Sequence, residues 1–189
     1  MATEPLSLGQ AKRLAASADT LLIRATRPAD LETPIGAFLR LDDGGPAFLL
    51  ESVEGGERLG RYSFLGAAPR RLLEVGDTEA RIVERPLSVE RFEPGLPTTV
   101  VPADDALAAL RSFVPRRRVL PAEGMPRFTG GAVGALAYDA ASGFEPSVAR
   151  PARDPIGLPL AAFGETDLVV VFDHLSHELS AIASLHTDR

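Results

Sequence analysis

The sequence predicts an α+β fold, with a mainly antiparallel β-sheet and a few flanking helices. The first observation is a series of short apolar runs, several with strand-like alternation, separated by turn-forming residues. The second is the turn sequence Gly76-Asp77-Thr78, which joins two such runs in the manner of a hairpin. The third is a set of three short segments that carry helix-start signals.

The three helix signals lie at 7–16, 30–41 and 104–113. Ser7 and Gln10 form a capping-box pattern at the start of the first helix. Thr33 is the expected N-cap of the second helix, and Pro34 is suited to its first helical position. The Asp104–Asp105 pair favours the positive N-terminal end of the third helix.

The expected strands cover 20–26, 47–53, 61–67, 70–75, 79–85, 131–138, 168–172 and 179–185. We expect 47–85 to form one antiparallel meander, because its apolar runs follow each other at short intervals. The segment 86–101 is rich in proline and glycine and is expected to be irregular, and 143–159 is expected to run over the surface. A turn at 173–178 should join the last two strands.

Composition limits the classes of function. The 189 residues suit one domain, 1–189. The formal charge of −6 argues against nucleic acid as a partner, and we interpret the single basic run, Arg116–Arg118, as a solvated loop. The chain has no cysteine, which fits the cytoplasm and excludes thiolate chemistry. No apolar run approaches the ~20 residues that cross a bilayer, so we expect a soluble protein with no membrane partner.

The residues do not predict a self-sufficient active site. His174 and His177 have a spacing seen in zinc sites, but they fall in an expected turn, where a solvated role is favoured. The glycine-rich segment 128–134 lacks the context of a phosphate loop, and it favours a tight strand with close backbone approach. There is no G-x-S-x-G elbow for a serine nucleophile. We therefore predict no catalytic residue and no metal ligand in this chain.

Glu51 and Ser52 are unusual because they continue the apolar run at 47–50. Successive side chains of a strand face opposite ways, so one of the two would face the interior. An unpaired buried polar group costs ~1–3 kcal/mol, so that side chain would need a partner. Alternatively, the strand ends at Leu50 and both side chains meet water.

Four motifs, in order, resemble the N-terminal region of anthranilate synthase component I. They are TPIGAFLRL at 33–41, FLLESVEGGERLGRYSFLG at 48–66, FTGGAVGALAYD at 128–139 with Glu145 following, and LVVVFDH at 168–174. The resemblance runs from about Pro28 to Leu185. It implies an enzyme that converts chorismate to anthranilate with Mg²⁺ and with ammonia from a glutaminase subunit, component II, under feedback inhibition by L-tryptophan.

The resemblance also implies a set of site residues. Leu50, Glu51 and Ser52 would line one wall of the tryptophan pocket, with Ser52 the strongest candidate. Arg61 and Ser63, on the next strand, would complete that wall. A hydroxyl can hydrogen-bond an amino-acid ligand, and Glu51 could offset its ammonium charge or pair with a nearby arginine.

The family's chorismate and Mg²⁺ residues lie in a C-terminal catalytic domain, which we expect to be missing here. The chain alone should therefore lack lyase activity and hold no cofactor, and its uncovered apolar surface should favour self-association. Two other readings stay open: the same region of aminodeoxychorismate synthase component I, from folate synthesis, and a stand-alone amino-acid sensor. The ESVEGGERLGRYS string, 51–63, favours the tryptophan branch over the folate branch.

Overall fold

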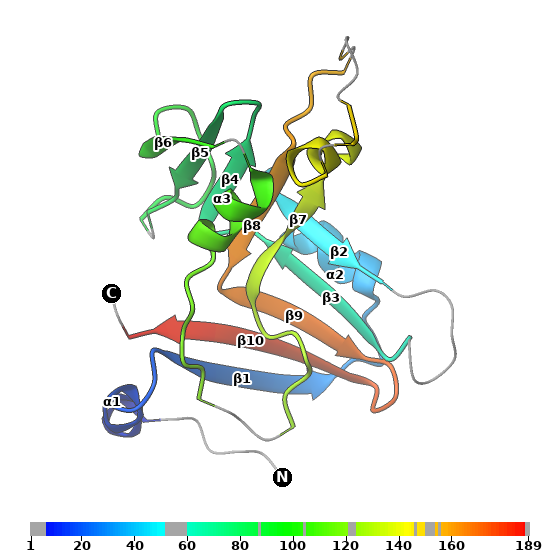
Figure 1. Cartoon of the computed structure of the whole chain (residues 1–189). Coiled ribbons are helices and arrows are strands. Elements are labelled where there is room, and N and C mark those ends of the chain that lie inside the picture. Colours follow the sequence, from blue (N-terminus) through cyan, green and yellow to red (C-terminus); the bar gives the residue numbers. More distant parts are fainter. Residues whose placement is uncertain are drawn as a thin grey trace.

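The computed structural model describes residues 7–51, 60–86, 88–103, 105–120, 124–145, 147–149, 154 and 156–187. They form two antiparallel five-stranded sheets with short helices around them, which confirms the predicted fold class (Figure 1). Sheet A has the order β1 (Thr20–Pro28), β10 (Glu178–His186), β9 (Leu168–Asp173), β3 (Tyr62–Ala67), β2 (Ala47–Leu50). Sheet B has the order β6 (Thr98–Pro102), β5 (Glu79–Glu84), β4 (Arg71–Val75), β8 (Ala161–Thr166), β7 (Gly131–Leu136).

The helices begin where the capping signals place them. In α1 (Leu8–Ala15) the reciprocal capping box of Ser7 and Gln10 is present. In α2 (Pro34–Leu41) the Thr33 hydroxyl accepts a hydrogen bond from the Gly36 N–H at 3.0 Å. In α3 (Ala106–Phe113) the N-cap is Asp105, whose carboxylate accepts from the backbone N–H of Leu107; Asp104 lies outside the described residues.

The meander expected over 47–85 is wrong in one respect, because it is divided between the two sheets. β2 pairs with β3 in sheet A, whereas β4 pairs with β5 in sheet B. The chain changes sheets at 68–70, where Ala68 has a positive φ of 48°. Such a change of sheet depends on pairing with distant strands, which the local pattern does not contain.

Three further elements differ from expectation. β6 lies at the end of the segment expected to be irregular, and it pairs with β5 although all five of its residues are exposed. β8 was not expected from the pattern, because small and polar residues interrupt its apolar alternation. A 3₁₀ helix, η2 (Tyr138–Gly143), follows β7 directly.

The first and last strands are neighbours in sheet A. β1 and β10 pair in register over nine residues, from Thr20 opposite His186 to Pro28 opposite Glu178. On one face of the sheet, Leu65, Phe172 and Leu179 form a core beneath α2. On the other face a second core contains Val169, Val171 and Ile182. In sheet B, α3 packs its buried Phe113 against β4.

A buried carboxylate lies close to the point where the chain passes from sheet B into sheet A. Glu165 lies near the end of β8 in sheet B, and the next strand, β9, belongs to sheet A. Its side chain is only 4% exposed. It accepts hydrogen bonds from Arg70, from Arg71 at 2.5 Å and from Arg117 at 3.1 Å. Burial disfavours the charge of Glu165, but the hydrogen bond from Arg71 and the nearby guanidinium charges outweigh it and lower the pKa. Arg71 also donates to the carbonyl of Phe113 and stacks on its ring, which ties α3 to this junction.

Several large apolar side chains remain in contact with solvent. Leu31 is 97% exposed, and Ile35 and Leu39 of α2 are 58% and 68% exposed. The expected self-association of the chain stays a prediction. No helix within the described part of the chain is long and apolar enough to span a membrane.

The close backbone approach expected of the glycine-rich segment is confirmed at Gly134, where β7 pairs with β8. A Cβ on Gly134 would lie 2.0 Å from the carbonyl oxygen of Ala162, so one strand must move to accept it. Gly134→Ala should therefore lower the free energy of unfolding by about 1–3 kcal/mol, measured by urea denaturation. Gly76→Ala is the matched control, because its Cβ would make an ordinary 3.5 Å contact. Equal effects of the two substitutions would refute this assignment.

Glu165→Gln should be strongly destabilising, because it leaves buried guanidinium groups without their shared counter-charge. We expect a loss of about 3–5 kcal/mol in the free energy of unfolding near neutral pH, measured by urea denaturation. Glu79→Gln is the control: its ion pair with Arg81, at 3.6 Å, joins side chains that are both more than half exposed. The control should change stability by less than about 1 kcal/mol. A loss at Glu165 as small as the control's would contradict the buried network.

Candidate ligand-binding site

The candidate site lies where β2 ends, beside β3 and the turn that joins β9 to β10 (Figure 1). Leu50, the last residue of β2, is opposite Phe64 of β3. On the other side of β3, Tyr62 is opposite Asp173, the last residue of β9. This register places the end of β2, the start of β3 and the β9–β10 turn together, at one end of the strands of sheet A. We call this end of the strands the site edge.

Ser63 is the buried centre of this edge. The residue is only 2% exposed, and its Oγ donates to Oε1 of Glu51 at 3.2 Å. The same Oγ lies 2.7 Å from Nε2 of His174. A buried hydroxyl requires such partners, because leaving it unsatisfied would be costly. The structure thus brings together two of the expected site residues, Glu51 and Ser63, and adds His174.

Leu50 and Ser52 lie on either side of Glu51 in the sequence. Leu50 is 47% exposed, so it offers apolar surface next to Glu51. β2 ends at Leu50, and Glu51 is exposed as a residue, as the alternative of a short strand required. Glu51 nevertheless has a hydrogen-bonding partner on β3. Ser52, the strongest candidate from the resemblance, lies outside the described residues.

Arg61 is committed to Asp173 in this structure. Its Nε lies 3.0 Å from Oδ1 and its second guanidinium nitrogen 2.7 Å from Oδ2, the geometry of a bidentate pair. The hydrogen bond from Arg61 lowers the pKa of Asp173 despite partial burial, and backbone N–H groups of the turn at Leu175 and Ser176 act in the same direction. Arg61 is therefore at the site, but it braces the turn rather than pairing with Glu51.

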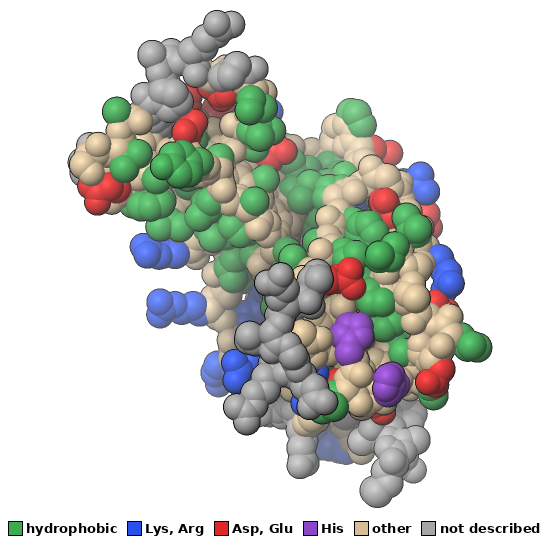
Figure 2. All heavy atoms as spheres, turned by 90° about the vertical axis from the view of Figure 1, so that its right-hand side faces the viewer, with side chains coloured by type: hydrophobic (Ala, Val, Ile, Leu, Met, Phe, Trp, Pro, Cys, Tyr) green, Lys and Arg blue, Asp and Glu red, His purple; other side chains and the backbone are tan. Residues whose placement is uncertain are grey.

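The two histidines of the turn have different surroundings. Both His174 and His177 are exposed, and histidine side chains are visible among apolar and acidic groups in Figure 2. His174 bonds to Ser63, and its backbone N–H donates to the Arg61 carbonyl at 2.8 Å. We expected both histidines to be solvated turn residues, and this expectation did not include the contact of His174 with Ser63. The contact depends on the pairing of β3 with β9, more than 100 residues away in the sequence.

A different cluster, Glu165, Asp167 and His186, has the donor types of a metal site among the described residues. Its carboxylates are already engaged: Glu165 with three arginines, and Asp167 with Arg70 at 2.9 Å and with His186 at 2.7 Å. A cation such as Mg²⁺ would have to displace guanidinium groups from the oxygens it needs. The cluster therefore does not fit a Mg²⁺ site.

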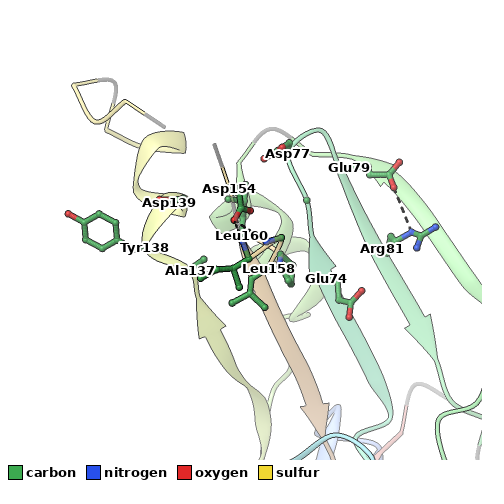
Figure 3. A pocket seen from close by; sticks show the side chains of 14 residues that line it. Glu74, Asp77, Glu79, Arg81, Ala137, Tyr138, Asp139, Asp154, Leu158 and Leu160 are labelled. Atoms are coloured by element: carbon green, nitrogen blue, oxygen red, sulfur yellow. Dashed lines mark hydrogen bonds and ion pairs between the residues drawn. The ribbon is translucent and has the colours of Figure 1, made fainter. Parts of the chain in front are cut away.

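An open hollow of about 700 Å³ lies at the outer end of sheet B. Figure 3 shows Glu79 joined to Arg81 on its rim, and Tyr138 pointing away from the other lining residues. Asp154 accepts from the backbone N–H groups of Ile156 and Gly157, which lowers its pKa. This carboxylate is thus occupied with shaping its own loop, and no expected site residue lines the hollow.

Comparison with known proteins gives a consistent family assignment. No family model matches the chain. The sequence is 39% identical over 155 residues to anthranilate synthase component 1 of Pseudomonas aeruginosa, covering 82% of this chain and 30% of that protein. It is 36% identical over 167 residues to the probable anthranilate synthase component 1 of Schizosaccharomyces pombe, covering 88% of this chain and 29% of that protein. The chain thus spans about 30% of the length of these curated relatives.

The chain is also similar to a solved structure, anthranilate synthase component I from Streptococcus pneumoniae TIGR4. The alignment covers 81% of this chain and 30% of that one. The TM-score is 0.44 and the sequence identity 24%.

Asp173→Asn tests the brace at the edge of the site. The pKa of Asp173 is lowered in the folded protein, so its contribution is present above the unfolded pKa of about 3.9 and is lost as the pH falls through the folded pKa. Near neutral pH we expect a loss of about 0.2–1 kcal/mol in unfolding free energy, because Arg61 is 40% exposed. In urea titrations at several pH values, the difference from wild type should shrink below about pH 3.9.

The control for this experiment is Asp30→Asn, at an exposed aspartate that lies near the same turn but outside the Arg61–Asp173 pair. It should show no comparable pH-dependent difference. A stability loss at Asp173 that stays constant into strong acid would argue against the ion pair as its cause.

Proposed function

Because the chain belongs to the anthranilate synthase component I family and corresponds to its N-terminal region, we propose that it is the regulatory part of that component. It contributes one wall of an L-tryptophan site at the edge formed by Leu50, Glu51 and Ser63. The family's role is in tryptophan biosynthesis, and the names of the relatives favour this branch over folate synthesis.

The observation that carries the proposal is the contact between Ser63 and Glu51 at an open strand end. A free amino acid presents an ammonium group, a carboxylate and a side chain. The Glu51 carboxylate is exposed and can accept from the ammonium group, and charge-assisted hydrogen bonds of this kind are the stronger ones. The exposed Leu50 offers an apolar contact for an aromatic side chain. Ser52 follows in sequence and is proposed as a further ligand of the same wall.

In this proposal, the chemical reaction takes place outside this chain. We propose that the conversion of chorismate to anthranilate takes place in a C-terminal catalytic domain, with Mg²⁺ bound there. The ammonia comes from a glutaminase subunit, component II. Binding of tryptophan at the wall described above would then regulate chemistry performed elsewhere, and the chain alone would be inactive.

L-tryptophan should bind to this chain in a calorimetric titration, and the catalytic domain should be added in a second titration to complete the pocket. Glu51→Ala and Ser52→Ala should each raise the dissociation constant about tenfold or more. This corresponds to the ~1.5–3 kcal/mol of a hydrogen bond to a charged group.

Ser112→Ala is the matched control, because Ser112 is exposed and bonds to its own helix, at the carbonyl of Ala108. It should leave the affinity unchanged. The proposal fails if tryptophan binds neither the chain nor its complex with the catalytic domain. It also fails if the control and site variants bind equally well.

A further inference from the structure

His174 lies at the site edge, and the proposed function gives it no role in ligand binding. It begins the turn between β9 and β10, and its ring contacts β3 through the 2.7 Å approach of Nε2 to Ser63 Oγ. Its backbone is fixed as well, by the hydrogen bond from its N–H to the Arg61 carbonyl. The ring therefore stands at a defined place beside a buried hydroxyl.

Counting protons fixes the direction of both hydrogen bonds of Ser63. A serine hydroxyl has one proton, and an ionised carboxylate can only accept. The 3.2 Å contact with Glu51 therefore uses the proton of Ser63. The shorter contact must then be donated by the histidine, which places a proton on Nε2 of His174.

We propose that His174 is a positioning residue of the ligand site. Its Nε2–H donates a hydrogen bond to Ser63 Oγ, so the hydroxyl proton of Ser63 is donated to the Glu51 carboxylate. Ser63 and His174 thus hold the Glu51 carboxylate at the open end of β2, where a ligand ammonium group can reach it.

The same chain of hydrogen bonds makes His174 responsive to what binds Glu51. An ammonium group that draws the carboxylate away from Ser63 frees the hydroxyl proton. Ser63 can then donate to Nε2, and His174 moves toward the tautomer with its proton on Nδ1. This consequence rests on the proposed function, whereas the positioning role can be tested without any ligand.

The test is ¹⁵N NMR of the histidine rings at about pH 8, where imidazole is mostly neutral and the two tautomers differ in ring nitrogen shifts. In the wild-type chain, His174 should be more completely protonated on Nε2 than His177. His177 serves as the internal reference, because it is exposed in the same turn. Glu51→Ala should shift His174 toward the Nδ1-protonated form, because the Ser63 proton becomes available.

Two further variants separate positioning from general structural effects. Ser63→Ala should make the His174 signals resemble those of His177. Glu178→Ala, at a glutamate close to the turn that bonds to Ser176 rather than Ser63, should leave His174 as in wild type. The proposal is overturned if wild-type His174 carries its proton on Nδ1, or if Glu51→Ala leaves its tautomer unchanged.

Addition of L-tryptophan distinguishes this proposal from the proposed function. Ligand binding should shift His174 in the wild type in the direction of Glu51→Ala. Calorimetric binding without any His174 response overturns the coupling and leaves the tryptophan site standing. A His174 response to Glu51→Ala, with no binding of tryptophan to chain or complex, supports the positioning role and overturns the tryptophan site.

Discussion

A network of charged side chains around the buried carboxylate of Glu165 links the two sheets. Arg70 pairs with Glu165 of β8 and with Asp167, and Asp167 bonds to His186 of β10. Glu165 gathers Arg70 and Arg71 from the start of β4 and Arg117 from the segment after α3. Burying a charge is favourable only when its partners are close and well placed. Charged contacts of Glu165 and Asp167 therefore hold the point where the chain passes from β8 into β9. Because β9 leads directly to the site turn, the position of that turn depends on this junction.

The candidate site is built by strand pairing between distant parts of the sequence. Ser63 is opposite Phe172, so the residues that follow Phe172 fall beside the end of β2. The bidentate pair between Arg61 and Asp173 then holds the turn against β3. These are fixed contacts among side chains that do not have to be ordered by a ligand. Preorganisation of this kind lowers the entropic cost of binding.

The local features were predictable from sequence, and the long-range ones were not. The caps at Ser7 and Thr33 identified helix starts because their chemistry acts within one turn of helix. The hairpin at Gly76–Thr78 was likewise a local property. The division of 47–85 between two sheets was missed, since it depends on β8 and β9 as pairing partners. Glu51 and Ser63 were singled out as site residues through the family motif. His174 was noted as a turn histidine, but its contact with Ser63, more than 100 residues away, depends on the fold.

The pairing of the first strand with the last has a consequence for how the chain folds. β1 acquires its partner only when β10 is available, and the Thr20 and His186 side chains that close this ladder are 166 residues apart. During synthesis, the backbone groups of β1 that pair with β10 stay without that partner until β10 has left the ribosome. A topology with such distant contacts folds slowly and exposes strand edges meanwhile. The yield of folded protein should therefore depend on how soon β10 becomes available to pair with β1.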